Sequence, residues 1–144
     1  MRITSTAFEN EGAIPQKYTC QGEDVSPPLA IEDIPEGARS LALIVDDPDA
    51  PMGTWLHWVM FDVAPAEKIE EGAAPGRQGV NDFGKKEYGG PCPPSGTHGY
   101  FFRLFALDAE LGLDEGAKRS QVEEAMTGHI LEKAELMGKY TKAG

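Results

Sequence analysis

The sequence predicts a mainly β, single-domain protein spanning residues 1–144, and three observations lead to that prediction. Its apolar residues occur in short runs separated by turn residues, with 17 glycines and 11 prolines in the chain. This pattern is typical of strands joined by tight turns. Only one stretch, near the C-terminus, has the three/four spacing of an amphipathic helix. A chain of this length buries about two-thirds of its unfolded surface, so one core suffices.

The expected strands are apolar runs bounded by turn residues; in chain order they are residues 1–8, Leu29–Ile31, Leu41–Val45, Val59–Val63 and Phe101–Leu107. The first two are short and are expected at sheet edges, whereas the others are core strands. Residues 65–86 are polar and rich in glycine, and we expect them to form a long surface excursion with little regular structure.

One helix is expected over Val122–Met137, where apolar residues recur at three/four spacing. Ser120 and Glu123 have the Ser-x-x-Glu spacing of a capping box, and Gly138 suits a C-terminal stop. His129 lies on the apolar stripe of this helix, so we expect a packed ring.

The charge and the cysteines exclude several classes of protein. A formal net charge of −11 argues against nucleic-acid binding, which relies on neutralising phosphates with Lys and Arg. The chain has no apolar signal core after Met1 and no run of ~18 apolar residues, which predicts a cytoplasmic protein without an integral membrane segment. In a reducing compartment Cys20 and Cys92 are expected to be free thiols; the alternative is a disulfide, if they meet in space.

Two histidine-bearing stretches stand out as a candidate site. Residues 46–58 carry three aspartates, two prolines, two tryptophans and His57 between two apolar runs. Residues 88–100 carry three prolines, four glycines and His98, and they lead into a core strand. Polar groups on rigid loops are where binding or chemistry usually occurs. We therefore expect the two stretches to share one site.

Three chemistries fit such a site. Two histidines with Asp47 or Asp49 are the ligands of a two-His-one-carboxylate metal centre, although short His-x-Asp or His-x-x-x-His spacings are absent. Ser95 with His98 and an aspartate is the composition of a hydrolase triad, but the Gly-x-Ser-x-Gly elbow is missing. Two imidazoles and backbone N–H groups also suit an anion, with prolines and Trp55 as walls. The remaining alternative is that the aspartates only cap a turn.

Together the two stretches resemble the phosphatidylethanolamine-binding protein family, most closely its bacterial and archaeal branch of Raf kinase inhibitor-like proteins. The motifs that carry the resemblance are Asp47-Pro-Asp-Ala-Pro51, Trp55-Leu-His57, Tyr88-Gly-Gly-Pro-Cys-Pro-Pro94 and His98-Gly-Tyr100. Residues 18–29, 81–84 and 128–131 also look like that branch. The resemblance implies a large antiparallel Greek-key sheet packed on a smaller sheet, with peripheral helices.

The resemblance also implies a small surface pocket for phosphate-like anions, including the phosphoethanolamine head group, with no cofactor or metal. Carried over to this chain, the pocket residues are Asp47, Pro48, Pro51, Trp55, His57, Cys92, Pro93, His98 and Tyr100, with Asp49 as a brace. We expect Asp47 to orient or protonate His57, and His98 and loop amides to donate to the anion.

The chain departs from the family pattern at two places. Gly99 stands where the family usually has Arg, and the segment before His98 is shorter than in many members. Arg103 is a candidate substitute for that Arg, because it is an even number of strand positions from Gly99.

We therefore predict a non-enzymatic, ligand-binding regulatory domain. The family implies inhibition of a kinase or a protease, and a homodimer is a further possibility. If imidazolium forms donate to the anion, affinity should rise as pH falls through about 6.5. The alternatives are a metal-dependent or Ser-type hydrolase, and a pure protein-interaction module that uses residues 65–86.

Overall fold

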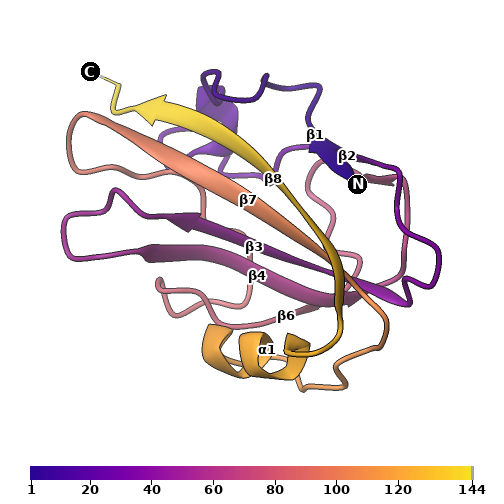
Figure 1. Cartoon of the computed structure of the whole chain (residues 1–144). Helices are drawn as coiled ribbons and strands as arrows, with labels where there is room; N and C mark the ends of the chain where they lie inside the picture. Colours follow the sequence, from indigo (N-terminus) through magenta and orange to yellow (C-terminus); the bar gives the residue numbers. More distant parts are fainter. Residues whose placement is uncertain (144) are drawn as a thin grey trace.

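The structure is a computed structural model that describes residues 1–143, and it consists of two antiparallel sheets with one α-helix (Figure 1). The small sheet has the strand order β1 (Arg2–Thr4), β2 (Leu29–Glu32) and β5 (Lys68–Ile69). The large sheet has the order β6 (Arg77–Gln78), β4 (Trp55–Val63), β3 (Ser40–Asp47), β7 (Thr97–Leu107) and β8 (Ile130–Thr141). The helical segments are the 3₁₀ turn η1 (Gln16–Tyr18) and α1 (Arg119–Met126). The predicted mainly β fold class is confirmed.

The central strand β3 is buried along its whole length, and its side chains alternate between two cores. Leu43 and Val45 belong to the core that the large sheet shares with the small sheet, which we call the inner face. Ala42 and Ile44 belong to a second core with residues of α1, which we call the outer face. Burial on both faces explains why this part of the sequence is apolar without alternation.

The predicted core strands are confirmed, but their boundaries and the position of one edge strand differ. β4 begins at Trp55 rather than at Val59, so the loop between β3 and β4 comprises only residues 48–54. β1 is an edge strand as expected, whereas β2 is the middle strand of the small sheet. The reason is β5, a two-residue strand in the polar excursion 65–86, which pairs with Leu29 and Ala30.

The predicted helix over Val122–Met137 is wrong beyond Met126. α1 ends at Met126, and β8 pairs with β7 from Ile130 onward. Gly128 has φ +83, a conformation that interrupts the helix. The N-terminal cap also differs from the Ser-x-x-Glu prediction, because the Lys118 N–H donates to Gln121 Oε1 at 2.9 Å.

Two residues assigned to that helix have other roles. Gly138 lies inside β8, where a Cβ atom would come within 2.5 Å of the Ile14 side chain and 2.7 Å of Phe8. Its glycine therefore serves close packing rather than a helix stop. His129 is exposed in the turn before β8, with Nδ1 2.8 Å from Asp108 Oδ1, so the expectation of a packed ring is wrong.

The two cysteines form a disulfide, with their Cα atoms 5.4 Å apart, so the prediction of free thiols is also wrong. Cys20 follows η1 and Cys92 lies in the loop before β7, and 72 positions separate them. Composition could not reveal that these loops meet. The cytoplasmic location stays a prediction. Within residues 1–143, no helix has the length and apolar character needed to cross a bilayer.

Candidate functional site

A β-bulge directs His57 into the inner face of the large sheet. Val45 of β3 pairs with Trp58, but the next residue, Asp46, pairs with Leu56. His57 is therefore the extra residue of the bulge, and its ring lies on the same side as Trp58. Leu56 belongs to the outer core instead. A bulge that re-aims one side chain in this way is common beside functional sites.

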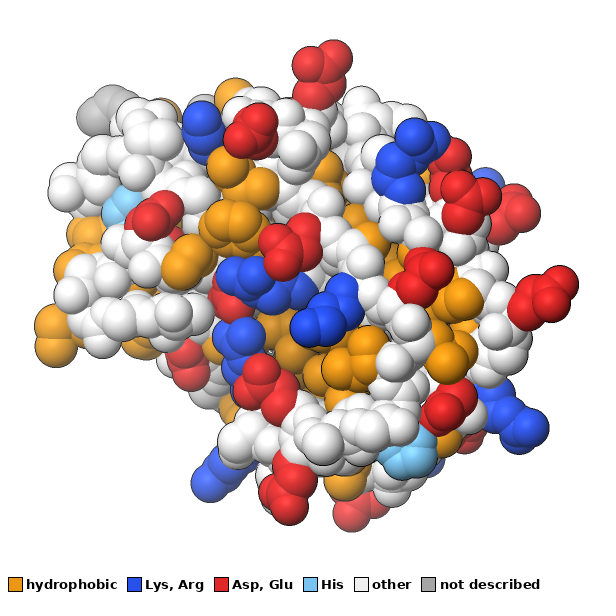
Figure 2. Space-filling view, in the orientation of Figure 1, with side chains coloured by type: hydrophobic (Ala, Val, Ile, Leu, Met, Phe, Trp, Pro, Cys, Tyr) orange, Lys and Arg blue, Asp and Glu red, His pale blue; other side chains and the backbone are white. Residues whose placement is uncertain are grey.

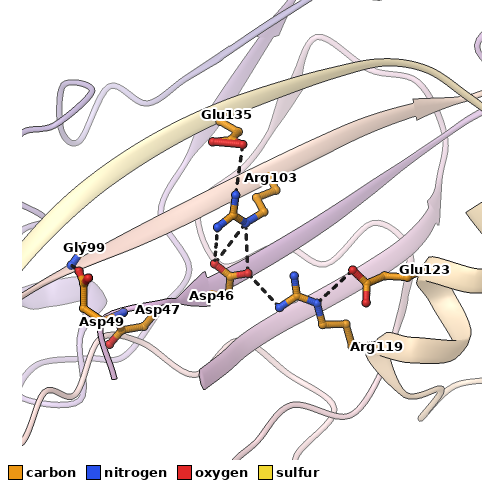
Figure 3. A network of polar contacts seen from close by, with 8 residues as sticks. All are labelled: Asp46, Asp47, Asp49, Gly99, Arg103, Arg119, Glu123 and Glu135. Atoms are coloured by element: carbon orange, nitrogen blue, oxygen red, sulfur yellow. Dashed lines mark hydrogen bonds and ion pairs between the residues drawn. The ribbon is translucent and has the colours of Figure 1, made fainter. Parts of the chain in front are cut away.

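Two neighbouring aspartates at the end of β3 point to opposite faces of the sheet. On the inner face, Asp47 Oδ2 lies 2.6 Å from Nδ1 of His98, which comes from β7. On the outer face, Asp46 accepts hydrogen bonds from Arg103 at 3.0–3.2 Å and pairs with Arg119 of α1 at 2.9 Å. Figure 3 shows both guanidinium groups meeting at the Asp46 carboxylate.

The same alternation places Arg103 on the face of Gly99, as the even spacing predicts, and this is the outer face, opposite His98. Its role as the substitute for the missing Arg stays a prediction. On the outer face Arg103 also pairs with Glu135 and helps to line a hollow beside α1. Figure 2 shows basic and apolar side chains together on this face of the molecule.

The inner-face histidines open onto a cavity of about 270 Å³. The side chains that line it come from the end of β3, from β4 and β7, and from the loops after β3 and before β7; they are Asp47, Ala50, Pro51, Met52, Trp55, His57, Phe83, Cys92, Pro93, Pro94, His98 and Tyr100. Eight of these are predicted pocket residues. Pro48 and Asp49 do not line the cavity. The other four lining residues, Ala50, Met52, Phe83 and Pro94, were not predicted from the sequence.

Asp49 supports the first loop rather than the cavity surface. Its Oδ2 accepts the Gly99 N–H at 2.9 Å, and its own N–H donates to Asp47 Oδ1 at 2.8 Å. A Cβ at Gly99 would lie 3.3 Å from the same carboxylate oxygen. The backbone N–H of Gly99 thus fixes the Asp49 carboxylate and the loop that carries it.

The second loop is bonded to β4 and to the segment after η1. His57 and Gly89 exchange two bonds: Nδ1–H donates to the Gly89 carbonyl at 2.7 Å, and the Gly89 N–H donates to the His57 carbonyl at 3.0 Å. The Gly90 N–H donates to Asp24 Oδ1 at 2.7 Å. A Cβ at Gly90 would lie only 2.2 Å from the Tyr18 carbonyl, so this approach requires glycine. Neither of these two glycine N–H groups is available to an anion; donation by other loop amides stays a prediction.

Asn81 is a buried residue beneath the site. Its role was not predicted from the sequence. Its Nδ2 donates to the carbonyls of His57 at 3.2 Å and Glu87 at 2.8 Å. Its Oδ1 accepts the N–H groups of Phe83 and Lys85, both at 3.0 Å. The resulting turn holds the Phe83 ring beside the His57 ring, with the two ring centroids 5.4 Å apart. An Asn-Asp-Phe-Gly turn inside a polar excursion was the available signal.

Burial shifts the pKa values of two side chains that line the cavity, His57 and Tyr100. It lowers the pKa of His57, against the opposing effects of the Gly89 carbonyl bond and the Asp47 charge. Burial also raises the pKa of Tyr100, with the charges of Asp47 and Asp49 acting in the same direction. The expectation that Asp47 orients or protonates His57 is corrected: Asp47 hydrogen-bonds His98, and His57 is oriented by the Gly89 carbonyl.

The other two chemistries find less support in the geometry. Among residues 1–143, no group of three His, Cys, Asp or Glu side chains is arranged to hold a metal ion. Ser95 is exposed and does not line the cavity, although the Asp47–His98 pair that a triad needs is present.

Comparisons with known proteins agree with this architecture. The family model described as phosphatidylethanolamine-binding protein matches residues 4–141. A UPF0098 protein from Methanothermobacter thermautotrophicus is 50% identical over 153 residues, covering 99% of each chain. The crystal structure of a phosphatidylethanolamine-binding protein homologue from Chlamydia trachomatis superposes with a TM-score of 0.96 at 45% identity, covering 99% of this chain and 97% of that one.

A more distant structure leads to the same family. Escherichia coli YbcL, described as a member of the mammalian PEBP family, matches with a TM-score of 0.91 at 27% identity, covering 99% of this chain and 98% of that one. The resemblance first noted in the two histidine stretches thus extends over nearly the whole chain. This chain belongs to the phosphatidylethanolamine-binding protein family.

Proposed function

We propose that this chain is a non-enzymatic binding protein that takes a phosphate-type anion, such as the phosphoethanolamine head group, in the cavity between His57 and His98. Family membership supports a binding role in general. The observation that carries the specific proposal is the convergence of two imidazoles from different strands on one cavity of about 270 Å³. A phosphate group with a short substituent is small enough for such a volume.

His98 is the main donor in this proposal. Its Nδ1–H is held by the Asp47 carboxylate, so Nε2 is the ring nitrogen left for a ligand. A positive charge on this ring is balanced by Asp47, and the ring is only 9% exposed. Pro51, Pro93 and Trp55 form apolar walls that exclude water from the bound group.

Calorimetric titration of phosphoethanolamine tests the proposal. Wild type is expected to bind, and His98→Asn is expected to bind at least ~10-fold more weakly, because a charge-assisted hydrogen bond is lost. His129→Asn, which changes an exposed histidine remote from the cavity, is the matched control and should bind as wild type. Absence of binding by wild type would contradict the proposal, and release of inorganic phosphate would contradict its non-enzymatic nature.

We also propose that the cavity mouth contacts a protein partner, in the manner of an inhibitor of a kinase or protease. The rim carries large apolar side chains that are exposed: Met52 at 95%, Trp55 at 37% and Phe83 at 41%. Exposed apolar clusters often mark interaction sites. If the rim inhibits an enzyme, Met52→Ser should weaken inhibition, because a large exposed apolar side chain is removed from the rim. Equal inhibition by both proteins would argue against this use of the rim.

A further inference from the structure

Both cavity histidines use their Nδ1 atoms inside the protein. The Nδ1 of His57 lies 2.7 Å from the Gly89 carbonyl oxygen, which can only accept, so Nδ1 must carry a proton. The Nδ1 of His98 lies 2.6 Å from the Asp47 carboxylate and carries a proton for the same reason. The nitrogen left to each ring is Nε2. In a neutral ring with this tautomer, Nε2 is a lone pair and therefore an acceptor.

The two rings differ in the group that would balance the positive charge of a doubly protonated imidazole. At His98 the positive charge would lie against the Asp47 carboxylate. At His57 the bonded partner is a neutral carbonyl, and the ring is 3% exposed and packed edge-on against Tyr100 and Phe83. An isolated buried cation is costly, whereas a paired one is tolerated.

The surroundings of His57 do not remove this difference. The ionisable groups that face it are Asp47 from β3, Asp24 from the segment after η1, and Tyr100 from β7. Burial raises the pKa of Tyr100, so its phenol stays uncharged. The two carboxylates act to raise the pKa of His57, but burial outweighs them and the pKa is lowered.

We propose that Nε2 of His57 accepts a hydrogen bond from a protonated oxygen of the ligand, and that the cavity therefore selects phosphate monoesters over sulfate esters. This inference rests on the proposed function, since it concerns the same anion. A monoester can present P–OH to Nε2 of His57 while an unprotonated oxygen meets His98. A sulfate ester oxygen has no proton to share, so it would face a lone pair or force the buried ring to become charged.

The experiment compares phosphoethanolamine with 2-aminoethyl hydrogen sulfate, which has the same shape, by calorimetry at pH 5.5. Each anion then carries mainly one negative charge, because the second pKa of a phosphate ester is about 6. We expect phosphoethanolamine to bind wild type at least ~10-fold more tightly. Equal affinities would overturn the selection while leaving anion binding intact. Failure of both compounds to bind would overturn the proposed function together with this inference.

The His57→Gln variant tests whether the preference for phosphate over sulfate depends on His57. His57→Gln puts an amide that can donate near the position of Nε2, so an unprotonated oxygen finds a partner. The preference for phosphate should fall to ~2-fold or less in this variant, whereas the His129→Gln control should keep it. Full preference in a folded His57→Gln, verified by thermal unfolding, would overturn the role given to His57. The wild-type comparison of the two anions does not depend on the variant folding.

Discussion

Asn81 does not line the cavity, yet its side chain makes four hydrogen bonds that hold the cavity wall in place. Both of its amide hydrogens and its oxygen are used, and the residue is 4% exposed. At the scale of single residues, the site is thus held in place by hydrogen bonds within the protein. His57 with Gly89 and Asp49 with Gly99 follow the same pattern.

Replacing Asn81 tests the importance of this bonding. Asn81→Ala should lower the free energy of unfolding by about 2–4 kcal/mol, because several hydrogen bonds are lost and the Glu87 carbonyl is left without this donor. Asn10→Ala is the matched control: it loses a single exposed bond to Met137 and should cost about 1 kcal/mol or less. Urea denaturation measures both, and similar losses in the two variants would contradict the prediction.

The lowered pKa of His57 predicts a pH dependence of stability. The folded protein holds this ring neutral below the unfolded pKa of about 6.5, so in that window the unfolded chain binds the proton more readily. Stability should therefore fall as pH is lowered from 6.5 toward the folded pKa. His57→Gln should remove this contribution, giving a shallower loss of stability between pH 7.5 and 5. Parallel profiles for the two proteins would show that burial of His57 has no such effect.

At the scale of elements, the difference between α1 and β8 is the main discrepancy with the sequence-based prediction. The apolar residues of 122–137 follow a three/four spacing. However, Ala134, Leu136 and Tyr140 lie on the same face of β8, which is the period of two of a strand. Local spacing allows both structures. Pairing with β7, which spans eleven registered residue pairs, determines the strand. Such a tertiary preference is not visible in a single segment.

Gly138 gives a test of the close packing of β8. Gly138→Ala should destabilise the protein by about 1–3 kcal/mol, because the added Cβ would lie 2.5 Å from Ile14 and 2.7 Å from Phe8. Gly99→Ala is the control in the neighbouring strand, where the atom nearest to a Cβ is Asp49 Oδ2, at 3.3 Å. Thermal unfolding measures both variants, and a Gly138→Ala protein no less stable than Gly99→Ala would contradict the prediction.

At the scale of the whole molecule, segments far apart in the chain build one site, and the disulfide joins two of them. The prediction recognised the two histidine stretches because both were unusual in composition. It paired Asp47 with the wrong histidine, because the choice depends on a bulge in β4 that leaves no mark in composition. It missed Phe83 because that ring reaches the cavity through the Asn81 turn, and it missed the disulfide because contacts between loops are not local.

Reducing the disulfide is expected to weaken the whole fold. In the chain-entropy model, a cross-link between residues 72 positions apart contributes about 4 kcal/mol by restricting the unfolded chain. Treatment with a thiol reductant, verified by counting free thiols, should lower the midpoint of urea denaturation. The double variant Cys20→Ser, Cys92→Ser should show the same midpoint with and without reductant. An unchanged midpoint in fully reduced wild type would contradict the prediction.

Because His57 is the extra residue of a bulge, the direction of its side chain is determined by the number of β4 residues opposite β3. It does not depend on which side chain stands at position 57. Other side chains can occupy position 57 and still face the cavity. Deleting one residue between Trp55 and Trp58 would restore regular alternation. The side chain that precedes Trp58 would then point to the outer face of the sheet, where α1 packs. Insertions and deletions in this short stretch should therefore be far more damaging to ligand binding than substitutions.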